Sequence, residues 1–191
     1  MSWTLIIEAI SVVFGVLFLV LLMREKRWCW FFGIVSSALS IVLFLHARLY
    51  SEAILYFFYV LIGIYGWWIW GNNNAEQELP IKRWSWVNHL WAIAVGVGGA
   101  FALGYTFFKY TYADHPFLDA HTTVFSFIAS YLQAHKILSN WIYWIIIDAI
   151  TAGLYFSKSF YLYTGLMILY LVLAIIGYLN WQQKLKKINT D

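Results

Sequence analysis

The sequence predicts an all-α membrane protein with seven transmembrane helices, arranged as two parallel three-helix repeats joined by a linker helix. Apolar residues fill 63% of the 191 positions and charged residues only 11%, which is more apolar surface than a soluble domain of this size buries. Seven apolar stretches approach the roughly 20 residues that a helix needs to cross a bilayer. The period-2 alternation typical of a membrane β-barrel is absent, so helices are predicted.

The predicted spans form two runs of three, with a single span between the runs. Their bounds are residues 3–23, 28–49, 51–70, 87–108, 117–134, 140–156 and 160–181. Short polar breaks separate the second span from the third and the sixth from the seventh, as in helical hairpins. We therefore expect a first repeat at 1–70, a cytoplasmic loop and linker helix at 71–113, a second repeat at 114–181 and a basic cytoplasmic tail at 182–191.

The three-helix unit occurs twice in the sequence. Residues 3–70 align with residues 114–181 without a gap, at a constant offset of 111 residues. Identical residues occupy many aligned positions, among them Trp30 and Trp141, Tyr59 and Tyr170, Gly66 and Gly177, and Trp70 and Trp181. A duplicated helical unit in an apolar chain is the plan of many transporters, in which the ligand path lies between the two halves.

Lysine and arginine residues predict the orientation in the membrane. When loops are assigned to alternate sides, one side holds nine of these residues and the other holds only Arg48, Lys109 and Lys158. The positive-inside rule then predicts an outside N-terminus and a cytoplasmic C-terminus. Because three spans and one linker span precede the second repeat, both repeats enter the membrane in the same direction.

Asp148 is the most informative polar residue, because a carboxylate in mid-bilayer costs at least about 2.5 kcal/mol and calls for a partner. Trp144 and Trp141 precede it by four and seven residues, so all three side chains share one helical face. Two indoles and an anion suit a flat, cationic, aromatic ligand through stacking and cation-π attraction. The alternative is an interhelical polar pair beside ordinary tryptophan packing.

The fifth span carries a polar stripe with helical spacing, formed by Asp119, Thr122, Ser126, Ser130 and Gln133. Such a line across the bilayer is what a solute pathway needs. Serine and threonine also tie membrane helices together, so packing is the alternative. Asp119 aligns with Glu8 of the first repeat, and a gating role and a structural role are equally open for these two carboxylates.

The two halves differ where the predicted site lies. Asp148 aligns with Ser37, and Trp144 aligns with Gly33, so only the second half carries the charge and the second indole. One substrate site is therefore expected, not two. On the third span, Tyr59 shares a helical face with Gly63 and Gly66, where core packing and ligand contact are both open.

Catalytic and metal-binding motifs are absent from the sequence, which has no His-Glu-x-x-His, no phosphate-binding glycine loop and no clustered histidines. The single cysteine, Cys29, excludes an internal disulfide framework. We expect no enzyme activity, no cofactor, no metal and no nucleic-acid partner.

Several segments resemble the PnuC family of bacterial vitamin transporters over nearly the whole chain. They are Arg48-Leu-Tyr-Ser-Glu-Ala, Tyr65-Gly-Trp-Trp-Ile-Trp, Asp119-Ala-His-Thr-Thr, Asn140-Trp-Ile-Tyr-Trp-Ile-Ile-Ile-Asp and Gly177-Tyr-Leu-Asn-Trp. The resemblance implies a full-length relative of the SWEET fold. It also implies inner-membrane uptake of nicotinamide riboside, thiamine or another unphosphorylated vitamin, which a cytoplasmic kinase then traps.

The family's Trp-x-x-Trp-x-x-x-Asn element, implicated in substrate binding, corresponds here to Trp141, Trp144 and Asp148. Asn140 stands where the nicotinamide riboside branch has glutamate. A neutral amide suits a carboxamide, whereas a carboxylate suits the charge or the aminopyrimidine of thiamine, so we rank thiamine slightly ahead of nicotinamide riboside, which is also a fixed cation.

The predicted function is facilitated uptake by alternating access between the two halves. We expect Trp141 and Trp144 to stack on the aromatic ring of the vitamin and Asp148 to bind its positive charge or its amine. Hydroxyl contacts are expected from Thr122, Ser126 and Tyr59. The lipid bilayer is the surrounding partner, and a homo-oligomer is compatible with the sequence. The rival class is a membrane receptor that binds the vitamin and does not translocate it.

Overall fold

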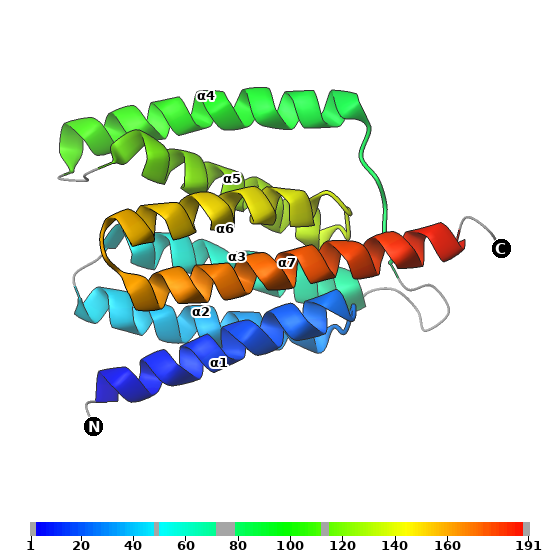
Figure 1. Cartoon of the computed structure of the whole chain (residues 1–191), viewed down its shortest axis with the longest axis horizontal. Coiled ribbons are helices and arrows are strands. Elements are labelled where there is room, and N and C mark those ends of the chain that lie inside the picture. The colour runs from blue at the N-terminus through cyan, green and yellow to red at the C-terminus, as the bar shows by residue number, and fades with distance from the viewer. Residues whose placement is uncertain (1–2, 48–49, 72–78, 112–114, 189–191) are drawn as a thin grey trace. The chain divides into compact units, whose positions relative to one another are not determined.

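The computed structural model of the chain describes residues 3–47, 50–71, 79–111 and 115–188 (Figure 1). Within these residues the chain forms seven α-helices and almost no other regular structure. The helices are α1 Trp3–Met23, α2 Trp28–His46, α3 Tyr50–Gly71, α4 Trp86–Tyr110, α5 Pro116–Ala134, α6 Asn140–Ser157 and α7 Tyr161–Ile188. Each coincides with one predicted span, and α7 continues past the predicted end at Trp181.

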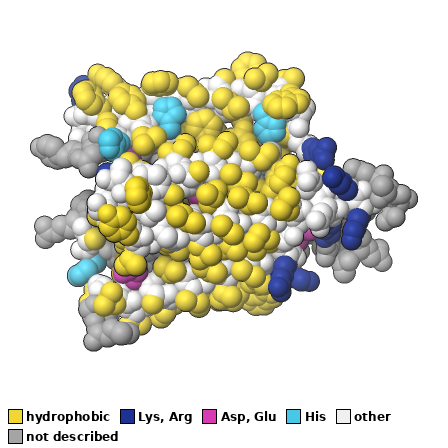
Figure 2. Space-filling model, viewed as in Figure 1, with side chains coloured by type: hydrophobic (Ala, Val, Ile, Leu, Met, Phe, Trp, Pro, Cys, Tyr) yellow, Lys and Arg dark blue, Asp and Glu magenta, His cyan; other side chains and the backbone are white. Residues whose placement is uncertain are grey.

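The helices have the apolar surface of a membrane protein. In the described part of the chain, five helices are long and apolar enough to cross a bilayer, namely α1, α2, α3, α4 and α7. Large apolar side chains such as Trp86, Val95 and Leu162 are exposed, and Figure 2 shows apolar side chains along the visible helices. The protein is therefore a multi-pass membrane protein. The two helices that fall short, α5 and α6, are those in which polar residues are concentrated.

The chain divides into two compact units. The first comprises Met1–Ile81, Ala134–Lys136 and Leu179–Asp191, and the second comprises Lys82–Gln133 and Ile137–Tyr178. Helix α4, the predicted linker, thus groups with the second unit, and the end of α7 groups with the first unit. The loop 72–78, which we expect on the cytoplasmic side, lies outside the described residues.

In the first unit, α2 packs against both α1 and α3. Hydroxyl groups join α1 to α2, because Ser11 Oγ lies 2.7 Å from Ser40 Oγ and Ser36 Oγ donates to the carbonyl of Ser11 at 2.8 Å. Gly66 of α3 lies directly against the indole of Trp30 on α2. A missing side chain at Gly66 therefore lets the two helices approach closely.

In the second unit, small residues of α4 face α5. Gly96 lies against Ile128 and Phe125, and Gly104 lies against Phe117. Gly177 of α7 lies against the indole of Trp141 on α6, where an added Cβ would come within 2.6 Å of the ring. The Trp141 and Gly177 contact in this unit reproduces the Trp30 and Gly66 contact of the first unit, at the aligned positions.

Two aligned turns have the same backbone geometry. After α1, Glu25 has a φ of 54° and Lys26 N–H donates to the carbonyl of Leu21 at 2.9 Å. After α5, Lys136 has a φ of 51° and Ile137 N–H donates to the carbonyl of Leu132, also at 2.9 Å. Such left-handed helix ends usually hold glycine, and a side chain there costs about 1 to 2 kcal/mol. The sequence repeat therefore extends to the local backbone conformation.

Candidate functional site

The polar stripe predicted on α5 is largely buried in the second unit. Ser126, Ser130 and Gln133 are each no more than 5% exposed. Thr122 Oγ1 donates to the carbonyl of Asp119 at 2.9 Å, and Ser126 Oγ donates to the carbonyl of Thr122 at 2.7 Å. These hydroxyl protons are used within the helix, so what the two oxygens offer to a ligand is acceptor capacity.

Trp144 of α6 is joined to this stripe. Its indole Nε1–H donates to the side-chain oxygen of Gln133 at 2.9 Å. The hydrogen bond links α6 to the end of α5 within the second unit. It also satisfies the single donor of the indole, which a half-buried tryptophan in an apolar setting needs.

Asp148 lies one helical turn beyond Trp144 and is 7% exposed. Among the described residues, no hydrogen bond or ion pair reaches its carboxylate, although its charge acts on Tyr170 of α7. Burying an unpaired carboxylate away from water costs free energy. In folded proteins such a group is paired with a cation or takes part in a functional site. Asp148 is thus a nearly buried carboxyl group for which the described residues of this unit provide no cationic partner.

Trp141 and Asn140 lie at the start of α6, and both are fully buried. The indole of Trp141 packs on Gly177, which is a helix-packing contact. Asn140 Nδ2 donates to the carbonyl of Ile137 at 2.7 Å, and its Oδ1 has no hydrogen-bond partner within the described structure. A role for these two residues in binding substrate stays a prediction.

Of the remaining predicted residues, Tyr59 and Glu8 belong to the first unit and Asp119 belongs to the second. Tyr59 lies half-buried on α3 of the first unit, edge-on to Tyr56 with the ring centroids 5.4 Å apart. Glu8 is exposed on α1, and Asp119 is half-buried in the first turn of α5. Arg48 lies outside the described residues. Gating by either carboxylate stays a prediction.

Sequence reasoning missed two features of the second unit. Tyr170 of α7 lies near Asp148. Its alignment with the candidate residue Tyr59 is a sequence signal that could have identified it. His89 of α4 stacks on Tyr143 of α6, with Nδ1 and the hydroxyl 3.2 Å apart. His89 and Tyr143 lie 54 residues apart, so no local pattern reveals this pair.

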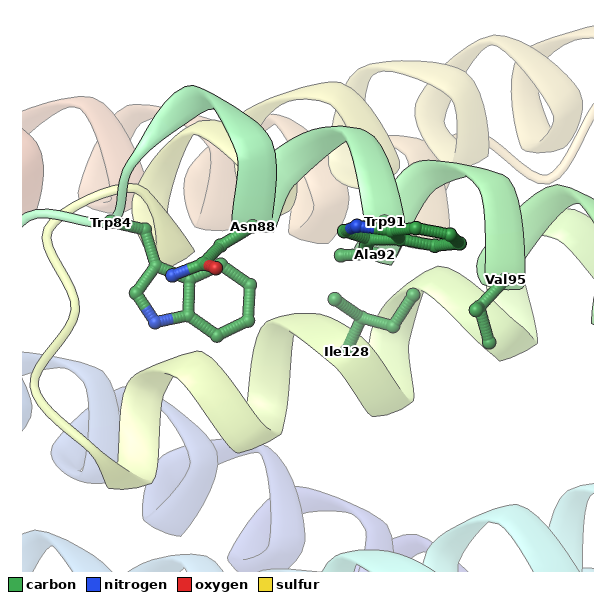
Figure 3. A pocket seen from close by; sticks show the side chains of 6 residues that line it. All are labelled: Trp84, Asn88, Trp91, Ala92, Val95 and Ile128. Carbon is green, nitrogen blue, oxygen red and sulfur yellow. The ribbon is translucent and has the colours of Figure 1, made fainter.

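A lateral groove of about 410 Å³ runs along α4 and α5, apart from Asp148 and Trp144 (Figure 3). It is lined almost wholly by apolar groups, from Trp84, Asn88, Trp91, Ala92, Val95 and Ile128. Figure 3 shows the indoles of Trp84 and Trp91 on the α4 side of Ile128. Nothing in this lining provides charge for a polar ligand. In the described part of the chain, no group of three His, Cys, Asp or Glu residues is placed to hold a metal ion.

The helices and the buried polar residues define a multi-pass membrane protein with an intramembrane polar site, which is the class to which transporters belong. The model of the nicotinamide mononucleotide transporter family matches residues 5–183. The chain belongs to this family, which includes the PnuC transporters. The resemblance noted in the sequence is therefore confirmed, and the protein is a membrane transporter and not an enzyme.

Several relatives support this assignment. The nicotinamide riboside transporter PnuC of Escherichia coli is 27% identical, over 95% of this chain and 85% of that protein. The riboflavin/roseoflavin transporter RibM of Streptomyces davaonensis is 23% identical, over 91% of this chain and 83% of that protein. A crystal structure of the vitamin B3 transporter PnuC has the same fold, with a TM-score of 0.78 and 24% identity, over 95% of this chain and 82% of that one.

Proposed function

We propose that the protein carries a small vitamin with a flat, positively charged heteroaromatic ring across the bacterial inner membrane. The observation that carries this proposal is Asp148, a nearly buried carboxylate with no ion-pair partner among the described residues. A cationic ligand compensates the cost of that charge in an apolar environment. A neutral ligand does not, so the carboxylate favours cations.

The neighbouring groups suit the rest of such a ligand. Trp144 lies one helical turn from Asp148 and presents an indole, which attracts cations by about 0.5 to 2 kcal/mol depending on desolvation. Thr122 and Ser126 offer hydroxyl oxygens as acceptors. Trp141, Asn140 and Tyr59 complete the proposed set, and Ser130, Gln133, Asp119 and Glu8 are the proposed pathway residues.

Thiamine is the first candidate, because a carboxylate accepts a hydrogen bond from its aminopyrimidine as well as matching its charge. Nicotinamide riboside is the second candidate, and the relatives that bear its name favour it. Riboflavin, named for a third relative, is uncharged and leaves Asp148 without a partner. Asp148 therefore favours the two cationic vitamins over riboflavin. The binding experiment below distinguishes thiamine from nicotinamide riboside.

The proposed mechanism is facilitated transport by alternating access between two three-helix repeats, with α4 as the linker. The aligned turns at Glu25 and Lys136 and the aligned tryptophan-glycine contacts support two repeats of common origin. The excess of lysine and arginine on one side of the predicted topology supports an outside N-terminus and a cytoplasmic C-terminus. A cytoplasmic kinase that phosphorylates the vitamin would keep uptake running downhill.

The proposal is tested by thermal unfolding of the purified protein in detergent with thiamine, nicotinamide riboside and riboflavin. A ligand that binds only the folded state raises the unfolding temperature, and the rise grows with the logarithm of the ligand concentration above its dissociation constant. We expect stabilisation by thiamine or nicotinamide riboside and none by riboflavin. Stabilisation by riboflavin alone would overturn the proposed cationic substrate class, and stabilisation by the riboside without thiamine would reverse the order of the two candidates.

A further inference from the structure

We infer that Gln133 is a positioning residue, which holds the indole of Trp144 in the orientation that receives the ligand. The inference rests on the proposed function and gives Gln133 a role other than lining a pathway. Its basis is the 2.9 Å hydrogen bond from Trp144 Nε1 to Gln133 Oε1, made by a glutamine that is 3% exposed.

The physical reason lies in the single polar atom of the indole. Tryptophan has one N–H donor and no acceptor, so an acceptor at one place on the ring edge selects one orientation of the ring about the Cβ–Cγ bond. The amide oxygen of Gln133 therefore fixes the orientation of the Trp144 ring, one helical turn before Asp148.

The residues that follow Gln133 in the chain make three contacts within the first unit. The Nε1–H of Trp70 donates to the carbonyl of Ala134 at 2.9 Å, and the hydroxyl of Tyr65 lies 3.0 Å from Nε2 of His135. Lys136 then pairs with Glu25 at 2.8 Å. Residues Ala134–Lys136 belong to the first unit, whereas Gln133 is the last residue before them in the second.

The repeat supports a role specific to the site. The positions aligned with Gln133 and Trp144 in the first half are Leu22 and Gly33. Leu22 is fully buried and Gly33 lies against Phe18, so the first half has apolar packing in place of the hydrogen bond. Scaffold contacts such as Trp141 on Gly177 occur in both halves, whereas the glutamine-tryptophan pair occurs in the half that carries Asp148.

A double-mutant cycle tests the inference. The dissociation constant of whichever cation stabilises the wild-type protein is measured for wild type, Gln133→Leu, Trp144→Phe and the double variant, with Gln133→Met as a second apolar replacement. Loss of one neutral hydrogen bond corresponds to an affinity loss of about threefold to tenfold. We expect that loss for Gln133→Leu in the wild-type background and less than about a twofold change when residue 144 is phenylalanine, which has no N–H.

One control variant sharpens the result. Thr106→Val removes a hydroxyl from α4, where Oγ1 donates to the carbonyl of Ala102, and is expected to leave affinity unchanged.

An equal loss for Gln133→Leu in both backgrounds would show that Gln133 contacts the ligand or acts elsewhere, and would overturn the inference, as would no loss in the wild-type background. These outcomes leave the proposed function intact. If the wild-type protein binds neither cation, the proposed function fails and the inference fails with it.

Discussion

Glu25 and Lys136 occupy aligned positions of the two sequence repeats and form an ion pair with each other at 2.8 Å. Both side chains are less than a tenth exposed. The same carboxylate pairs with Lys184 of α7 at 2.7 Å, and the Lys136 ammonium lies 4.5 Å from the ring centre of Trp70. One carboxylate thus joins the turn after α1, the turn after α5 and the end of α7 within the first unit.

Replacing Lys136 by methionine should destabilise the protein strongly, because among the described residues it leaves the buried Glu25 carboxylate with the half-exposed Lys184 as its one ion-pair partner. Breaking a buried pair on one side costs about 3 to 5 kcal/mol. The unfolding temperature in detergent measures the loss. The neutral double variant, Glu25→Gln with Lys136→Met, leaves no buried charge at this site and should recover part of the loss. A double variant no more stable than Lys136→Met would contradict the direct pairing.

Adding a methyl group at Gly177 should also destabilise the protein. The new Cβ would lie within 2.6 Å of the Trp141 ring, and forced overpacking costs about 1 to 3 kcal/mol. Gly66→Ala should behave in the same way against Trp30. The matched control is Gly165→Ala, also on α7, where an added Cβ meets nothing within 4 Å. Equal unfolding temperatures for Gly177→Ala and Gly165→Ala would show that the tryptophan contact is not tight.

Asp148→Asn should separate stability from binding. Removing a buried charge that has no ion-pair partner among the described residues should raise the unfolding temperature of the ligand-free protein. The same change should weaken binding of a cationic vitamin by about tenfold to a hundredfold, the range expected when a hydrogen bond to a charged group is lost. Calorimetric titration and thermal unfolding measure the two effects. Wild-type affinity in the variant would assign Asp148 a structural role.

The proposed orientation predicts which introduced cysteines react from outside the cell. Cys29 is the chain's single cysteine and is buried, so it provides an unreactive background. Lys26 and Ser157 are both exposed, and the topology assigns them to opposite sides. A membrane-impermeant maleimide added to intact cells should label Ser157→Cys and not Lys26→Cys. The reverse pattern would invert the topology.

The positions of the helices were predictable from sequence because long apolar stretches separated by polar breaks are a strong signal in a membrane protein. The extension of α7 to Ile188 was not, since its last turns are basic and polar, and the ion pair of Lys184 with Glu25 depends on the tertiary structure. Asp148 was recognisable because a carboxylate in an apolar helix stands out locally.

The partners of the candidate site residues were harder to predict than the residues themselves. Helical spacing puts Trp141, Trp144 and Asp148 on one face but does not say which neighbouring helix each one meets. The structure packs Trp141 on Gly177 and bonds Trp144 to Gln133. Those pairings depend on the rotation of α5 and α7 about their axes, which a single sequence does not encode in any local pattern.

The central claim is that the protein translocates a cationic vitamin with the help of Asp148, and flux into proteoliposomes tests it most directly. Vesicles with wild-type protein, with Asp148→Asn and without protein are given radiolabelled thiamine or nicotinamide riboside, and the label inside is followed over time. We predict uptake above the empty vesicles for the wild type and reduced uptake for Asp148→Asn. Binding of a cation without any uptake by the wild type would contradict the claim and identify a non-translocating receptor.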